Sequence, residues 1–423
     1  MQLLSFRIHK LGLIQETDEI RLNRLMIFSG ESGLGKSYLA MLCHYFFDVL
    51  LDRSRISSFF EEKGFIYDEL RPAFKNEGTA FTFRKKDFEE WLATDAIKYL
   101  EYMINAELPD ARIEVSLPDA VDDEITIRYA EELTGLVNNE ETYLRLSLAS
   151  LTTRVKDNGF HEESPFSFIF RFYLIKCIFG DHTSLKDSFV FPPSRGPVLT
   201  EEIRPITGMY SKFKDCLYKL KRPVREGEES YRTVAALFSQ VLNGTVSYTD
   251  GNYVYQTEGT ELPISAAAAS IRELAPIEQM VKKVDLSKTA LLIEEPEAHL
   301  HPLKQRMMAD ITSGMLHTGA FMQVTTHSDY YLRRINELIL LNRLSNREDF
   351  KAIAEKLGVL PELAIDTATV SAYLLERGED GHAKVIRQNL SEGVPFASFH
   401  AALKESLTSL AELNRLISDY GRD

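Results

Sequence analysis

LMIFSGESGLGKS, residues 25–37, is the sequence pattern that indicates the fold class most strongly. Its apolar start reads as a strand, its glycines break that strand, and an apolar helix pattern follows Ser37. Residues 30–37 fit GxxxxGK[ST], a loop whose main-chain N–H groups cradle phosphates. In such a loop Lys36 contacts the β- and γ-phosphates, and the Ser37 hydroxyl binds Mg²⁺. The predicted nucleotide-binding residues are Gly30, Glu31, Ser32, Gly33, Leu34, Gly35, Lys36 and Ser37.

ALLIEEPEAHLHP, residues 290–302, is the second motif. Four apolar residues predict a buried central strand, and two carboxylates follow at its C-terminal end, where parallel α/β sheets place their ligands. We expect Glu294 to hold Mg²⁺ through water. Glu295 would take a proton from an attacking water as general base.

FMQVTTHS, residues 321–328, is the third motif, and it ends a predicted strand on His327. A lone histidine at such a place is usually a surface or core residue. Because it comes about thirty residues after the acidic strand, His327 is predicted to contact the γ-phosphate and position the attacking water. Together with Lys36 and Glu295 it completes the predicted catalytic set.

The order of these motifs resembles that found in the ABC-type ATPases. Within this class it is most similar to the OLD-like and RecF/SMC-like branch, which acts in prokaryotic DNA repair and phage defence. Three further stretches are similar to that branch: SFRIHKLGLIQ (5–15), FPPSRG (191–196), and the segment from VLNGTV (241–246) to IREL (271–274). The resemblance covers roughly residues 1–45 and 185–335. It implies an α/β fold, an ABC-type ATPase head with a mixed or parallel central sheet, and ATP and Mg²⁺ as cofactors.

The resemblance also implies that ATP lies between two heads, each completing the site of the other. The element acting in trans corresponds here to SAAAASIR, residues 265–272, at a predicted helix start. Ser265 would cap this helix, and Ser265 and Ser270 are the expected contacts to the partner's nucleotide. The alternative is that the alanine run is simply a good helix former.

Three departures from the family pattern predict slow hydrolysis. The serine–glycine signature is missing from residues 265–272. Glu294 stands where aspartate is usual, and no glutamine occurs between Gln15 and Gln240 to form the usual glutamine loop. ATP binding is therefore expected to carry most of the signal.

The chain divides into three predicted parts. Residues 1–45 and 185–345 form the discontinuous head. Residues 46–184 form a mainly helical insertion, with a helix at 86–106, strand candidates at 111–117 and 124–129, and none of the sustained heptads of an SMC arm. Residues 346–423 form an α/β-helical tail. It ends in a helix with Leu403, Leu407, Leu410, Leu413 and Ile417 on one broad face.

Composition places the chain among ordinary globular proteins, at 44% hydrophobic and 26% charged residues. Its three cysteines have no metal-ligand spacing, which favours reduced thiols and a cytoplasmic location. The apolar run 166–179 contains Arg171 and Lys176 and is short for a membrane span, so a core helix and no membrane contact are expected. The net charge of −14 does not indicate nucleic-acid binding, although a local basic face is compatible with it.

Two other features of the sequence, Arg195 and the basic segment 212–225, each allow two interpretations. Arg195, in the loop after the strand at 188–191, makes either a structural ion pair or a nucleotide or interface contact. Residues 212–225, KFKDCLYKLKRPVR, carry six basic residues on an amphipathic helix pattern, either a solvated face or a surface for nucleic acid or an acidic partner.

The leading functional hypothesis is an ATP-driven switch or sensor that dimerises or forms larger oligomers. It would control a separate effector, a nuclease or toxin, in prokaryotic phage defence. The segment after His327 has no DxD pair of a TOPRIM nuclease, and in this it resembles the stand-alone ATPases of two-gene defence systems. The alternative is a RecF/SMC-like ATPase that clamps DNA during repair. A transporter subunit fits the EEPEAHLHP continuation and the missing glutamine poorly, and a kinase fits Glu295 and His327 poorly.

Overall fold

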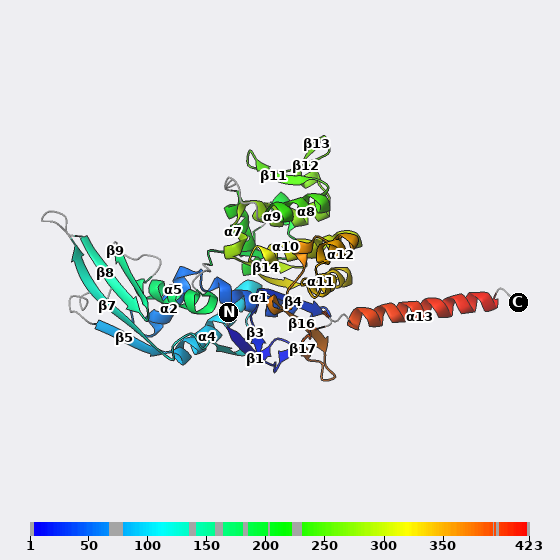
Figure 1. Cartoon of the computed structure of the whole chain (residues 1–423). Coiled ribbons are helices and arrows are strands. Elements are labelled where there is room, and N and C mark those ends of the chain that lie inside the picture. The colour runs from blue at the N-terminus through cyan, green and yellow to red at the C-terminus, as the bar shows by residue number, and fades with distance from the viewer. Residues whose placement is uncertain are drawn as a thin grey trace.

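β4 (Leu25–Gly30), the strand before the phosphate loop, lies inside a large mixed sheet of the computed structural model (Figure 1). The structure describes residues 4–66, 79–134, 141–156, 164–180, 185–201, 204–221, 231–391, 393–394 and 397–420. Along the sheet the strands follow the order β10 (Asp187–Phe191), β14 (Thr289–Glu294), β15 (Phe321–Thr325), β4, β16 (Val370–Arg377), β17 (Ala383–Arg387), β2 (Ile14–Gln15), β1 (Ser5–Leu11) and β3 (Ile20–Arg21), and β6 (Arg112–Ser116) pairs with β1.

The strands from β10 to β16 are parallel, and β17 is antiparallel to β16. The ends of β4, β14 and β15 therefore meet at one edge of the sheet, which brings the three sequence motifs together. The predicted α/β class with a mixed central sheet is confirmed.

Two hydrophobic cores lie on opposite faces of this sheet. In β4, Met26 and Phe28 face the core under α1 (Lys36–Asp48), whereas Leu25 and Ile27 face the other core. This alternation follows from the two-residue period of a strand, and burial on both faces explains why β4 and β14 are continuous apolar runs. The second core is covered by α8 (Arg232–Leu242), α9 (Ala269–Lys283), α10 (Pro302–His317) and α11 (Asp329–Asn342).

The insertion forms a lobe at one side of the head (Figure 1). It combines α2 (Arg53–Glu62), α4 (Lys85–Ile104) and α5 (Pro165–Phe179) with an antiparallel sheet of β5 (Thr79–Arg84), β7 (Glu124–Thr134), β8 (Glu141–Leu148) and β9 (Leu151–Lys156). The lobe thus contains more strand than the sequence predicted. Aromatic rings fill its core; Phe59 and Phe170 contact Phe88 at ring-centroid distances of 5.0 and 4.8 Å. The apolar run 166–179 is a core helix, as expected.

The C-terminal part contributes to the head more than the predicted boundary at residue 345 allows. After α12 (Phe350–Lys356), β16 pairs with β4 from Val370 to Leu375, directly beside the strand that carries the phosphate loop. β17 continues the sheet towards β2. Only the last helix, α13 (Ala397–Tyr420), projects from the body (Figure 1).

The remaining elements stand above the second core. They are α6 (Gly196–Thr200), α7 (Gly208–Leu220) and a small sheet of β11 (Thr245–Thr249), β12 (Asn252–Thr257) and β13 (Thr260–Pro263) (Figure 1). Among the described ranges, no helix combines the length and apolar character that a membrane crossing needs.

Candidate nucleotide-binding site

The phosphate loop connects β4 to α1 through glycines in left-handed conformations. The φ angle is 115° at Gly30, 76° at Gly33 and 98° at Gly35, values that side-chain-bearing residues rarely adopt. A Cβ atom at Gly30 would lie 2.0 Å from the carbonyl oxygen of Leu375 in β16. Because Gly35 is the N-cap of α1, the amide end of that helix opens towards the loop, the arrangement that binds phosphate.

Lys36 is buried within this loop. Its ammonium donates hydrogen bonds to the main-chain carbonyls of Gly30, at 3.0 Å, and Glu31, at 2.5 Å. Burial lowers the pKa of Lys36 to about 8, although the nearby charges of Glu295 and Glu294 act in the opposite direction. A desolvated ammonium at the centre of a phosphate loop is suited to contact an anionic ligand.

Glu294 and Ser37 form a polar pair at the end of β14. The Ser37 hydroxyl donates to Glu294 Oε2 at 2.7 Å, whereas Glu294 Oε1 is buried without a hydrogen-bond partner among the described residues. Burial raises the pKa of Glu294 to about 7. An unpartnered carboxylate oxygen beside a serine hydroxyl is the kind of oxygen-ligand set that Mg²⁺ prefers, so these two residues fit that ion.

Glu295 follows Glu294 in a left-handed conformation with φ 47°. Its N–H donates to the Thr325 carbonyl at 3.1 Å and lies 3.3 Å from the Thr325 hydroxyl, so β15 holds this turn. The Glu295 side chain is 38% exposed, and Oε1 lies 3.9 Å from His327 Nε2. A carboxylate in this position is accessible to a water molecule in front of the phosphate loop.

A cavity of about 570 Å³ joins these groups. Of the predicted residues, Ser32, Gly33, Gly35, Lys36, Ser37, Glu294, Glu295 and His327 line it. The structure therefore brings the three sequence motifs into one site, at the C-terminal ends of parallel strands, where the sequence predicted it.

His327 is positioned by a carboxylate that the sequence analysis did not assign. The buried Glu297 accepts hydrogen bonds from the Thr326 hydroxyl, at 2.5 Å, and from the His327 main-chain N–H, at 3.0 Å. Burial lowers the pKa of His327, and the charge of Lys36 lowers it further. The imidazole is therefore neutral near pH 7 and able to donate or accept a proton. The PEAHLHP continuation of the acidic strand was the only sequence signal for Glu297.

Arg195 is fully buried, and its side chain connects three elements. Nε donates to the carbonyl of Glu273 in α9 at 3.0 Å, and Nη1 donates to the carbonyl of Glu294 at 2.7 Å. The Glu273 carboxylate lies 3.5 Å from Nε and accepts the N–H groups of Arg195 and Gly196, at 2.6 and 3.0 Å. Of the two alternatives left open for Arg195, the structure shows a structural ion pair, and the same side chain also contacts the main-chain carbonyls of Glu294 and Glu295.

The segment 265–272 differs from its prediction. Ser265 lies in the 3₁₀ turn η3 (Ile264–Ala266), and α9 begins four residues later, at Ala269. Ser265 therefore does not cap the helix: Ala267 and Ala268 are extended and separate the two, and the Ala267 side chain packs into the core. Ser270 lies in the first turn of α9.

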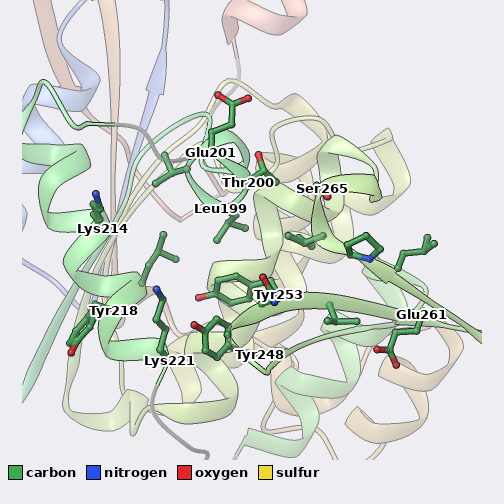
Figure 2. A pocket seen from close by; sticks show the side chains of 18 residues that line it. Leu199, Thr200, Glu201, Lys214, Tyr218, Lys221, Tyr248, Tyr253, Glu261 and Ser265 are labelled. Atoms are coloured by element: carbon green, nitrogen blue, oxygen red, sulfur yellow. The ribbon is translucent and has the colours of Figure 1, made fainter.

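Ser265 lines a different cavity, of about 750 Å³, bounded by α6, α7 and the β11–β13 sheet (Figure 2). Tyr248 and Tyr253 line it from the small sheet, Lys214 lines it from α7, and Lys221 follows directly after that helix (Figure 2). No lining residue is shared with the cavity at the phosphate loop. Within one chain, then, Ser265 does not join the site built around Lys36.

The predicted basic helix corresponds to α7, and its amphipathic pattern is confirmed by the buried side chains of Phe213, Leu217 and Leu220. Lys212 forms an ion pair with Asp48 of α1 at 2.8 Å. Residues 222–225, which carry two of the six basic side chains, lie outside the described residues.

Gly12, Leu13 and Tyr38 also line the nucleotide-site cavity, and the sequence analysis assigned them no role. The first two form the turn between β1 and β2, and the Leu13 side chain is 40% exposed. A glycine turn is a weak signal by itself, so only the folded sheet places this one beside the phosphate loop.

No family model and no curated protein matches this chain. Among solved structures, the SMC head bound to the C-winged helix domain of ScpA is 11% identical, over 92% of this chain and 98% of that chain, with a TM-score of 0.36. The SMC head domain from Thermotoga maritima is 11% identical, over 92% and 100% of the two chains, with a TM-score of 0.32. A third, the Smc head with an extended coiled coil bound to the C-terminal domain of ScpA from Pyrococcus furiosus, is 11% identical over 98% and 100%, with a TM-score of 0.34. These similarities are too distant to assign residues.

Proposed function

We propose that this chain is a Mg²⁺-dependent ATPase of the ABC type that works as a switch between copies of itself. One observation carries the proposal. The phosphate loop, the Ser37–Glu294 pair, Glu295 and His327 line one cavity although three separate segments supply them. That set contains a group for each requirement of nucleotide hydrolysis: phosphate binding, a metal ligand, a base and a water-positioning residue.

Each residue has a defined task in this mechanism. The amide end of α1 and the Lys36 ammonium would bind the phosphates. Ser37 and Glu294 would hold Mg²⁺, whose charge would neutralise that of the phosphates. Glu295 accepts a proton from the attacking water at its exposed carboxylate. His327 orients that same water, since its Nε2 lies only 3.9 Å from Glu295 Oε1.

The switch part of the proposal concerns a second copy. The amide end of α9, with Ser270 in its first turn, and the exposed Ser265 are the groups offered to a nucleotide bound by the partner. Neither Ser265 nor Ser270 lines the phosphate-loop cavity of its own chain. Hydrolysis would be slow because the trans element lacks the serine–glycine signature, so ATP binding itself would set the state of the dimer.

We further propose that this switch controls a separate effector, a nuclease or toxin, in phage defence. Support comes from the order of the three motifs, which resembles that of the OLD-like branch.

The alternative is a DNA-clamping ATPase of the RecF/SMC type. Its support is the exposed basic side chains of α7 and its end, Lys214, Lys219 and Lys221. An ATP-dependent affinity for duplex DNA that falls steeply with salt would favour the clamp. The net charge of −14 favours a protein effector over DNA as the partner.

The test compares wild type, Lys36→Ala and Glu295→Gln by light scattering and by ATP turnover, with and without Mg²⁺. Lys36→Ala should lose nucleotide binding. Glu295→Gln should keep binding, lose turnover by at least about 100-fold and accumulate an ATP-bound assembly. Hydrolysis by Glu295→Gln at the wild-type rate would contradict the proposed base. A mass and a hydrodynamic radius that both stay the same with and without ATP in all three proteins would contradict the switch.

A further inference from the structure

The C-terminal helix α13 exposes an apolar face that nothing in the described chain covers. The helix extends away from the body (Figure 1), and the described side chains from residue 404 to residue 417 are all exposed. Among them are five large apolar side chains with exposed fractions of 52–69%: Leu407, Leu410, Leu413, Leu416 and Ile417. So large an apolar surface on one isolated helix indicates an interaction site.

The last described residue before α13, Val394, is held by the head. The Asn336 side chain in α11 donates to the carbonyl of Val394 at 2.8 Å and accepts the N–H of the same residue. α13 begins three residues after Val394. With 24 residues and about 1.5 Å of rise per residue, it extends about 36 Å.

The spacing of α13 is that of a coiled coil. Positions 399, 403, 406, 410, 413, 417 and 420 alternate by four and three residues, and all except Ser406 are large and apolar. The pattern covers about three heptads, the minimum length at which a heptad repeat favours a coiled coil. Leu407 and Leu416 lie on the two flanks of this seam and widen it.

The charged residues of α13 lie where they do not oppose pairing with a like helix. Lys404, Glu405, Glu412, Arg415 and Asp419 all fall at the outer heptad positions, and the positions flanking the seam carry no charged residue. Two identical helices can therefore approach without like-charge repulsion. A parallel arrangement also places Ser406 opposite Ser406, whereas an antiparallel one buries each hydroxyl against an apolar side chain.

We propose that α13 pairs in parallel with α13 of a second copy, forming a two-fold coiled coil that holds two heads together without nucleotide. Such a tether raises the effective concentration of one head at the other, so that a weak ATP-dependent contact between heads suffices for switching. The inference rests on α13 alone and does not require the proposed ATPase activity.

The experiment uses the full chain carrying Lys36→Ala, which removes nucleotide-driven association. Light scattering should give twice the mass of one chain. Adding Leu410→Glu should reduce it to one chain mass, whereas Thr408→Glu, which adds the same charge on the outer face, should leave the dimer intact. Because both positions are exposed, circular dichroism should show the head folded in each protein.

Orientation is tested by Ile417→Cys under mild oxidation. A parallel pair places the two Ile417 positions opposite each other and should give a disulfide-linked dimer, and Thr408→Cys should give none. A monomer in the Lys36→Ala background, or a dimer that survives Leu410→Glu, would overturn the proposal. Dimers without an Ile417→Cys crosslink would overturn the parallel arrangement.

Discussion

Arg195 donates a hydrogen bond from Nη2 to the main-chain carbonyl of Glu295, at 3.3 Å, and Glu295 itself has a left-handed φ of 47°. For a residue with a side chain, that conformation costs about 1–2 kcal/mol. The Thr325 carbonyl holds the N–H of the same residue at 3.1 Å. Both polar groups of the Glu295 peptide are therefore fixed, and the carboxylate is presented by a turn that the surroundings impose.

Arg195 is itself held by an ion pair with Glu273. We therefore predict that these two side chains contribute to stability in a strongly coupled way. Arg195→Ala leaves the Glu273 carboxylate buried without its counter-charge, and we expect a loss of about 3 kcal/mol in the free energy of unfolding. Arg195→Ala/Glu273→Ala should lose less than the sum of the single variants, by about 1–3 kcal/mol. Urea unfolding of the four proteins measures the cycle. Additive losses would show that the two side chains stabilise the turn independently.

Gly30 and Gly33 form a matched pair for testing the contact between the phosphate loop and β16. Both have positive φ, but a Cβ at Gly30 would meet the Leu375 carbonyl at 2.0 Å, whereas a Cβ at Gly33 would meet nothing within 4 Å. We expect Gly33→Ala to cost about 1–2 kcal/mol from backbone strain alone. Gly30→Ala should cost about 4 kcal/mol or more, because main-chain atoms must move. Equal losses in urea unfolding would mean that β16 does not support the loop in solution.

The difference between these glycines also shows where sequence reasoning ends. The phosphate loop, the acidic strand and His327 could be predicted because each is a local pattern, and the parallel-sheet rule then placed them at one edge. The pairing of β16 with β4 is set by partners some 345 residues apart, and no local period of residues 370–377 specifies it. The buried role of Arg195 depends on carbonyl groups of other segments, which a sequence does not display.

The prediction that Ser265 caps a helix was wrong because a local sequence rule was used where tertiary packing decides the structure. A serine before an alanine run is a reasonable helix cap. In the structure the chain leaves β13 through a 3₁₀ turn and buries Ala267 before α9 begins, so tertiary packing decides the helix start. The same limit explains the predicted end of the head domain at residue 345. The segment after it was predicted to be a separate tail, but it supplies two strands of the central sheet.

Glu294 predicts a pH-dependent cost to stability in the absence of nucleotide and Mg²⁺. Burial raises its pKa from 4.5 to about 7, so the carboxyl is neutral in both the folded and the unfolded state below about pH 4.5. As the pH rises from 4.5 to 7, the unfolded chain ionises first and the folded state loses stability. Above pH 7 the full cost is present, on the order of 3 kcal/mol for a shift of this size.

Glu294→Gln removes the charge and keeps an acceptor for Ser37. Relative to wild type, the variant should gain stability progressively between pH 4.5 and 7 and keep that gain at pH 8. Urea unfolding at pH 4.5, 6 and 8 with a chelator present measures the difference. A gain independent of pH would mean that Glu294 is hydrated in solution despite its burial.

His327 and Glu297 allow the water-positioning role to be separated from simple support of the fold. His327→Gln should lower ATP turnover by about 100-fold while changing nucleotide affinity only a few-fold, because the phosphate loop and Lys36 supply most of the phosphate binding and the imidazole acts mainly on the water. Glu297→Gln keeps an acceptor for the His327 N–H and the Thr326 hydroxyl, so it should retain more activity than His327→Gln. Glu297→Ala removes that acceptor and should release the His327 turn, lowering turnover towards that of the histidine variant. The measurements are single-turnover hydrolysis and equilibrium nucleotide binding on each protein. If His327→Gln lost affinity and turnover in equal proportion, His327 would be a ligand-binding residue, and the positioning of water would have to come from Glu295 alone.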